Sequence, residues 1–114
     1  MNRSYSLKRH KEFRYTYRVG RSFHSPLLTL VYAKSRNETV RIGFSVSKRV
    51  GNSVQRNRAK RRMRAAVSPT VDRLKGGCNL VFIAKPEVLD APFTELVQQA
   101  EQLLRRCGAW EENA

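Results

Sequence analysis

The segment from Lys48 to Arg64, KRVGNSVQRNRAKRRMR, holds eight cations in seventeen positions and no acidic residue. Mutual repulsion makes such a run costly unless a polyanion lies against it. The segment also carries signals of regular structure, because Asn52 or Ser53 can cap a helix and Pro69 stands beyond its end. We therefore predict a helix from Ser53 to about Val67, embedded in a fold, that presents positive charge to a partner.

Projected at 3.6 residues per turn, this helix has a broad cationic face and a narrow apolar seam. The seam is made of small residues, so it can anchor the helix on a sheet but buries little area. Cations at i and i+4 repel each other, whereas a phosphate backbone would relieve that repulsion by releasing counterions. The cationic face comprises Arg56, Asn57, Lys60, Arg61 and Arg64, the seam comprises Ala59, Met63, Ala66 and Val67, and Arg58 and Arg62 flank the far side of the seam.

The composition limits both the class of protein and the partner. The chain has 114 residues, of which 40% are hydrophobic, enough for one domain with one core. Its 23 Lys and Arg residues against 9 Asp and Glu give a net charge of +14, which points to nucleic acid or an anionic membrane surface. The cationic helix lacks the large apolar face that inserts into a bilayer, so nucleic acid is favoured.

The chain is expected to be cytoplasmic. No apolar run approaches the ~20 residues that span a bilayer, and the start, MNRSYSLKRHKEF, has no apolar stretch of signal-peptide length. An arginine-rich start would also suit an organelle transit peptide, but Phe13 and Tyr17 fit a structural helix better. The two cysteines, Cys78 and Cys107, are expected to be free thiols, and Cys107 is expected to pack in the core.

The remaining periodic segments predict a mixed α/β domain spanning the chain. The strand pattern of Val40–Ser47 alternates, with Arg41, Gly43, Ser45 and Ser47 on one small, polar face. Together with the preceding strand it is expected to form a hairpin, and the crossover from Val40 to Ala84 is long enough for a parallel pair. The other expected elements are a helix over His10–Val19 ending at Gly20, a short extra strand near Arg21–Ser25, strands over Leu27–Ala33 and Leu80–Ala84, a last helix from Pro92 to Gly108, and a loose tail over Ala109–Ala114.

The chain carries no pattern of a protein-only nuclease. Such an enzyme needs clustered carboxylates for metals or a histidine pair for acid–base work. No acid lies between Thr39 and Val71, and His10 and His24 stand alone in basic surroundings. We therefore expect no catalytic residue and no metal site in the chain itself.

The stretch from Gly51 to Arg64 resembles the RNR signature of the bacterial ribonuclease P protein component. The preceding Arg41–Arg49 is similar to that family's strand and lysine-rich turn. The early helix with Phe13 and Tyr17 also fits, as does the late strand Leu80–Ala84 followed by Lys85 and Pro86. The resemblance covers roughly residues 7–107, and the fixed spacing of the signature makes it specific.

The resemblance implies the family's fold and function. The fold is α/β (α+β), an α-β-β-α-β-α sandwich with a mixed four-stranded sheet and a left-handed βαβ crossover, like domain 2 of ribosomal protein S5. The function is that of the protein subunit of ribonuclease P, a ribonucleoprotein endoribonuclease that removes the 5′ leader from precursor tRNA. The partners implied are the catalytic RNA subunit and the leader, and the cofactor is Mg²⁺ held mainly by the RNA.

The resemblance also implies two sets of site residues. Residues that match the RNR helix and the basic turn before it would face the catalytic RNA, and an aromatic pair with the polar sheet face would form a cleft for the leader. Stacking there would be worth about 1–3 kcal/mol per base. The first set is Lys48, Arg49, Arg56, Asn57, Arg58, Lys60, Arg61 and Arg64, and the second is Phe13, Tyr17, Arg41, Ser45 and Ser47.

Two positions depart from the family pattern. Arg62 stands where the family often has an apolar residue, so that edge of the helix is expected to be less buried. The strand Thr29–Val31 lacks the aromatic that some members place in the cleft, and the alternation leaves open whether Val31 or Tyr32 takes its place. The aromatic pair Phe13 and Tyr17 also has an alternative interpretation as ordinary core packing.

Two other functions fit the cationic helix. The chain could be a ribosomal or general RNA-binding protein without an enzymatic partner. It could also be a DNA-binding module that places the helix in the major groove.

Overall fold

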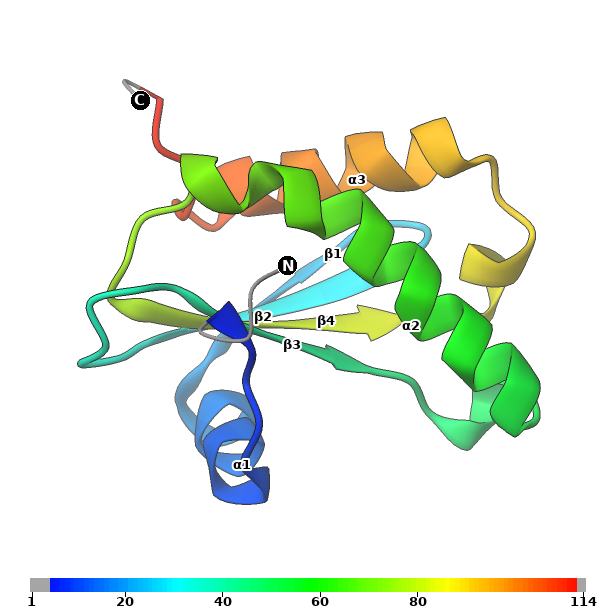
Figure 1. Ribbon diagram of the computed structural model, residues 1–114, viewed down its shortest axis with the longest axis horizontal. Coiled ribbons are helices and arrows are strands. Elements are labelled where there is room, and N and C mark those ends of the chain that lie inside the picture. Colours follow the sequence, from blue (N-terminus) through cyan, green and yellow to red (C-terminus); the bar gives the residue numbers. More distant parts are fainter. Residues whose placement is uncertain (1–4, 113–114) are drawn as a thin grey trace.

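The computed structural model of the protein describes residues 5–112, in which helices cover both faces of a four-stranded sheet (Figure 1). Helix α1 lies on one face, and α2 and α3 lie side by side on the other. The helices and strands in chain order are α1 (His10–Val19), β1 (Arg21–His24), β2 (Leu28–Lys34), β3 (Arg41–Ser45), α2 (Ser53–Val67), β4 (Cys78–Ala84) and α3 (Phe93–Arg106). Short 3-10 helices join them, namely η2 (Lys48–Val50), η3 (Ser68–Arg73) and η4 (Pro86–Leu89).

The α+β fold with a mixed sheet is confirmed, and so are the limits of α1 and α2. The extra strand near Arg21–Ser25 exists as β1, which pairs antiparallel with β2. The crossover from β3 through α2 joins two parallel strands, β3 and β4, as the length of the connection predicted. The helix limits were predictable because caps and apolar spacing are local signals.

The predicted hairpin between the second and third strands is wrong. The strand order is β1-β2-β4-β3, so β4 lies between β2 and β3 and pairs with both. Strand β4 is apolar on both faces and buried along nearly its whole length, which suits the centre of a sheet. Strand β3 instead takes the edge, where the chain before α1 covers it: the N–H of Leu7 donates to the carbonyl of Ile42 at 2.9 Å.

The sheet has a large core on one face and a small one on the other. The large core lies between the sheet and helices α2 and α3, and includes Leu30, Leu80, Phe82, Leu96 and Leu103 without any exposed surface. The small core lies beneath α1 and consists of Leu7, Val31 and Val81, with Phe13 and Ile83 packed against it. The face beneath α1 is thus only partly covered.

The tail from Ala109, which was expected to be loose, packs against the rest of the protein in its described part, residues 109–112. Ala109 and Trp110 are buried, and the N–H of Lys75 donates to the carbonyl of Ala109 at 2.8 Å. The indole of Trp110 lies between the guanidinium groups of Arg73 and Arg105, whose Cζ atoms are 5.3 and 4.6 Å from the ring centroid. Apolar burial and these contacts hold the tail. The structure does not describe residues 113–114 of this tail. It also does not describe residues 1–4, which belong to the start that was expected to lack a signal peptide.

Both cysteines are free thiols. Cys78 is buried in β4, and burial raises the pKa of its thiol from 9.0 to about 12. Cys107 is half-buried at the end of α3, and burial also raises the pKa of its thiol. Within residues 5–112, every helix is too short or too polar to cross a membrane.

Candidate nucleic-acid interface

Helix α2 begins at a capping box that fixes where its cationic face starts. The Asn52 side chain accepts from the N–H of Gln55 at 2.9 Å, and Gln55 Oε1 accepts from the N–H of Asn52 at 2.9 Å. Gly51 has φ of 148°, and a Cβ there would lie 2.0 Å from Gln55 Oε1. Glycine is therefore required for the returning Gln55 side chain as well as for the backbone.

The apolar seam of α2 lies as predicted. Ala59, Met63, Ala66 and Val67 are all buried against the sheet and α3. These buried side chains lie on one side of the helix, and the cations of the opposite face stay outside. The seam therefore orients the charges without covering them.

The cations of α2 are not neutralised by the protein's own acids. Among residues 5–112, ion pairs join only Arg105 to the carboxylates of Glu101 and Glu112. The guanidinium of Arg64 instead lies over the Phe44 ring of edge strand β3, with Cζ 5.6 Å from the centroid. Of the predicted RNA-facing residues, Lys48, Arg49, Asn57, Arg58, Lys60, Arg61 and Arg64 are exposed and Arg56 is half-buried. The face that they form carries a repulsion that only an external anion can relieve.

Arg62 differs from the other cations of α2 because its guanidinium group contacts residues of the protein itself. Its Nη2 donates to the carbonyl of Ala91, and its Cζ lies 6.0 Å from the centroid of Phe93. The side chain is half-buried toward α3, less buried than the apolar seam residues of the same helix. Arg62 therefore belongs to the packing between α2 and the start of α3.

The aromatic pair of α1 lies over the less covered face of the sheet. Phe13 rests on the backbone of Gly43, where a Cβ would come within 2.5 Å of its ring, while Tyr17 is 43% exposed. The two ring centroids are 6.4 Å apart with planes inclined by 45°. Phe13 thus combines core packing with a partly open surface, and Tyr17 is available to a partner.

The predicted polar sheet face is divided. Arg41 and Ser45 both point to the α1 side of β3, but Phe13 covers Gly43 between them, so they lie on opposite sides of that ring. Ser47 lies beyond the strand, and its Oγ accepts from the N–H of Arg49 at 3.3 Å as the cap of η2. The prediction that Ser47 continues the sheet face is therefore wrong, because β3 ends at Ser45.

The pairing register of β2 shows which of Val31 and Tyr32 faces the α1 side of the sheet. Val31 pairs with Val81 and packs in the small core beneath α1, whereas Tyr32 packs against the large core on the other face. Val31 therefore takes the cleft-side position.

Two features of this surface escaped the sequence analysis. A hollow of about 220 Å³ at the β3 edge is lined by Phe13 and Gly43 on one side and by Lys60 and Arg64 on the other, so Phe13 and α2 border the same hollow. The second feature is a polar pair on the Ser45 side of Phe13: His24 Nδ1 and Thr29 Oγ1 are 3.1 Å apart. These two residues are paired across neighbouring strands, and the same line of cross-strand pairs continues through Ile83 to Ser45. Only the strand order brings these residues together, so spacing alone carried no signal.

The described residues do not fit a protein-held Mg²⁺ ion. Throughout the described part of the chain, three or more His, Cys, Asp or Glu side chains nowhere gather within metal-binding reach. Mg²⁺ prefers carboxylate and phosphate oxygens, and this surface offers cations.

Comparison with known proteins shows the family of this chain. The family model described as Ribonuclease P matches residues 1–108. The ribonuclease P protein component of Chloroflexus aurantiacus strain J-10-fl is 50% identical over 107 residues, covering 93% of this chain and 79% of that protein. The chain belongs to the ribonuclease P protein family.

Other ribonuclease P proteins are also similar. The protein component of a Nitratiruptor species is 44% identical over 101 residues, covering 89% of this chain and 90% of that protein. Two solved structures share the fold at 23% and 20% identity: the RNase P protein of Staphylococcus aureus has a TM-score of 0.83 and that of Thermotoga maritima 0.79. They cover 93% and 89% of this chain and 97% and 96% of their own chains. The chain is thus the protein component of the tRNA-processing ribonucleoprotein enzyme ribonuclease P.

Proposed function

We propose that the exposed face of α2, together with η2, binds the catalytic RNA of ribonuclease P. The exposed cations lie on a helix whose seam is buried, and no carboxylate of residues 5–112 pairs with them. Guanidinium groups suit phosphate and stacked bases, and each phosphate contact releases counterions. The unpaired cations of α2 are the observation that carries this proposal. The contacting residues are Lys48, Arg49, Arg56, Asn57, Arg58, Lys60, Arg61 and Arg64.

The single-stranded 5′ leader of precursor tRNA binds the sheet face beside α1. Tyr17 and the open edge of Phe13 offer aromatic surface for stacking, and Ser45 borders it with a hydroxyl. Arg41 does not belong to this cleft, since it lies on the other side of Phe13. The hollow between Phe13 and Arg64 connects the cleft to α2, so one RNA surface can continue into the other.

Hydrolysis of the phosphodiester takes place in the RNA subunit, with Mg²⁺ held mainly by RNA. This chain contributes charge neutralisation and positioning, which lower the Mg²⁺ concentration that the RNA requires. Multiple-turnover cleavage of precursor tRNA by the catalytic RNA at low Mg²⁺, with and without the protein, tests this role. We expect strong stimulation by the protein, and an unchanged rate would refute the proposal.

A ribosomal or general RNA-binding role finds no support in the family match. Sequencing the RNA that co-purifies with the protein separates the roles. A single non-ribosomal RNA is expected, whereas ribosomal RNA would favour the other role, and tight competition by duplex DNA would favour a DNA-binding module.

A further inference from the structure

An exposed guanidinium of α2 lies over an aromatic ring of the sheet. Arg64 is exposed, and its Cζ is 5.6 Å from the centroid of the Phe44 ring in β3. Within residues 5–112, the guanidinium of Arg64 has neither an ion pair nor a hydrogen-bond acceptor. The ring therefore attracts the guanidinium electrostatically while the N–H donors of Arg64 stay free.

The Phe44 ring is itself held by the core. It is 9% exposed, and it stacks on Phe82 of the central strand β4, with centroids 6.0 Å apart and planes inclined by 22°. The two residues are paired between β3 and β4, and Phe82 has no exposed surface. Close packing limits the motion of such a ring, whereas an arginine side chain on a helix surface has many rotamers. Phe44 is thus a fixed surface beneath a side chain that would otherwise be mobile.

The charge of Lys60 makes the position of Arg64 sensitive to this ring. Lys60 and Arg64 are four residues apart on α2, and both border the hollow of about 220 Å³ at the β3 edge. Like charges at this spacing repel, which favours rotamers that turn the Arg64 guanidinium away from Lys60. Attraction to Phe44 opposes this repulsion and keeps the two cations beside the same hollow.

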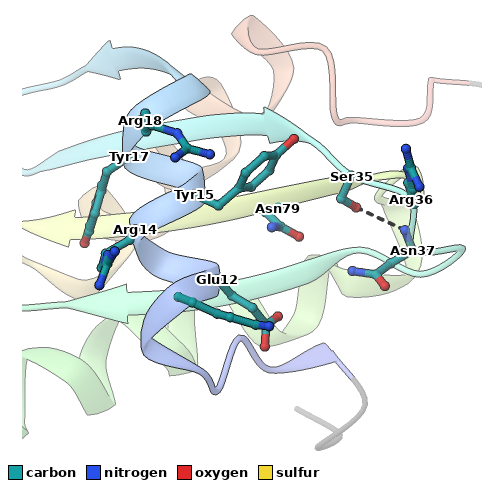
Figure 2. Close-up of a pocket in the computed structure, with 10 residues that line it drawn as sticks. Glu12, Arg14, Tyr15, Tyr17, Arg18, Ser35, Arg36, Asn37 and Asn79 are labelled. Atoms are coloured by element: carbon teal, nitrogen blue, oxygen red, sulfur yellow. Dashed lines mark hydrogen bonds between the residues drawn. The ribbon is translucent and has the colours of Figure 1, made fainter.

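The cations of α1 are not held in this way. Arg14 and Arg18 border a hollow of about 1010 Å³ together with the exposed side chains of Tyr15 and Tyr17 (Figure 2). In the described part of the chain, however, guanidinium groups lie over phenylalanine and tryptophan rings and over no tyrosine. An arginine and an aromatic residue on the same helix therefore do not by themselves make this contact.

We propose that Phe44 is a positioning residue for the catalytic RNA, which acts through Arg64. The ring holds the guanidinium beside Lys60 with its N–H donors free, so less side-chain freedom is lost when a phosphate binds. Phe44 is itself not a contact residue, because nearly all of its surface is buried. The inference rests on the RNA contact proposed for α2, and it adds to that contact a residue of the sheet.

A double-mutant cycle on the full-length protein tests the inference, with the dissociation constant of the catalytic RNA as the measured quantity. Phe44→Leu, which keeps an apolar side chain but removes the ring, should weaken binding about 2- to 5-fold, the effect of one exposed cation–π contact. In the Arg64→Gln background the same change should cause no further loss, whereas in the Arg61→Gln background it should cause the full loss. An equal loss in both backgrounds, or no loss from Phe44→Leu alone, would overturn the proposal.

Phe93→Leu is the matched control. It removes the ring beneath Arg62, whose guanidinium donates to the carbonyl of Ala91, and it should leave RNA binding unchanged. Urea denaturation of each variant gives the folded fraction under the conditions of the binding measurement. Equal weakening by the two leucine variants would show a general effect on the fold and would overturn the positioning role.

Two results separate this inference from the proposed function. If Arg64→Gln leaves RNA binding unchanged, both the RNA contact proposed for Arg64 and its positioning by Phe44 are wrong. If Arg64→Gln weakens binding and Phe44→Leu does not, only the positioning role is wrong, and the RNA contact of α2 stands.

NMR of the parent protein without RNA keeps the inference testable if Phe44→Leu does not fold. The Nε–H signals of Arg64 and Arg61 are assigned by their loss in the two glutamine variants. The Arg64 signal should be displaced by the ring current of Phe44 and should show less motion on the ps–ns timescale than the Arg61 signal. Arg61 is exposed on the same helix, and no ring lies against its guanidinium in the described structure. Equal mobility of the two guanidinium groups would overturn the proposal.

Discussion

The ring of Phe13 rests directly on the backbone of Gly43, so closely that a Cβ at Gly43 would lie 2.5 Å from the ring. This contact seats α1 on the edge strand and separates the Ser45 side of the sheet from the Arg41 side. The missing side chain at Gly43 therefore lets the Phe13 ring stand between Arg41 and Ser45 on this face of the sheet.

Substitution of Gly43→Ala should push Phe13 and α1 away from the sheet. We expect a loss of about 1–3 kcal/mol in the free energy of unfolding, the usual cost of overpacking. Urea denaturation measures it. Ser45→Ala, on the same strand and the same face but half-buried, is the control and should change the stability by less than about 0.5 kcal/mol. Equal stability of the two variants would show that Phe13 moves without cost.

Removing the Tyr17 ring should weaken binding of the leader without unfolding the protein. Tyr17→Ala is expected to cost about 1–3 kcal/mol in the affinity of the holoenzyme for precursor tRNA with a long leader. Substrate with a one-nucleotide leader should bind as before. Tyr17→Phe should retain affinity, and Val19→Ala, exposed on the same helix, should have no effect. A loss shared by both substrates would argue against a leader contact.

The cations of α2 should separate into two groups. Arg61→Ala and Arg64→Ala should each weaken binding of the catalytic RNA and reduce the slope of log K against log salt by about one. Arg62→Ala should keep that slope but lower the free energy of unfolding by about 1–3 kcal/mol, since it loses the Ala91 carbonyl and the Phe93 ring. Salt-dependent binding and urea denaturation of the same variants measure both quantities. A reduced slope for Arg62→Ala would place that guanidinium against RNA instead.

The capping box of α2 should contribute to stability independently of RNA. Asn52→Ala removes the oxygen that accepts from the N–H of Gln55 and should cost about 1 kcal/mol in unfolding free energy. Asn52→Asp keeps an oxygen acceptor and adds a favourable charge at a helix N-terminus, so the stability should be retained. Thermal or urea denaturation without RNA measures both, and equal losses would contradict the cap.

Stability should fall in strong alkali because of Cys78. Burial raises the pKa of this thiol from 9.0 to about 12, so folding favours the neutral thiol. The stabilisation is therefore complete below about pH 9 and is lost as the pH rises toward 12. Urea denaturation between pH 8 and pH 11 should show a smaller decline for Cys78→Ala than for the parent protein. Parallel declines would mean that other groups, such as lysines, account for the whole effect.

The sequence alone determined those features whose signals are local. The ends of α1 and α2 follow from apolar spacing, from the Asn52 cap and from residues that cannot continue a helix. The cationic face of α2 was visible for the same reason, because 3.6-residue periodicity assigns each side chain to a face without knowledge of the rest of the fold. The family followed from a run of fixed spacing within that helix.

Only the tertiary structure decided the features that depend on which segments become neighbours. Alternation along β3 was correct, yet β4, some thirty residues later in the chain, takes the place beside it that β2 was expected to occupy. Because β4 lies between β2 and β3, Asn79 pairs with Arg41 beneath α1. Long-range packing also places Arg62 of α2 against the carbonyl of Ala91. Periodicity assigns a residue to one side of its own element, whereas its partners depend on long-range packing, which local spacing does not encode.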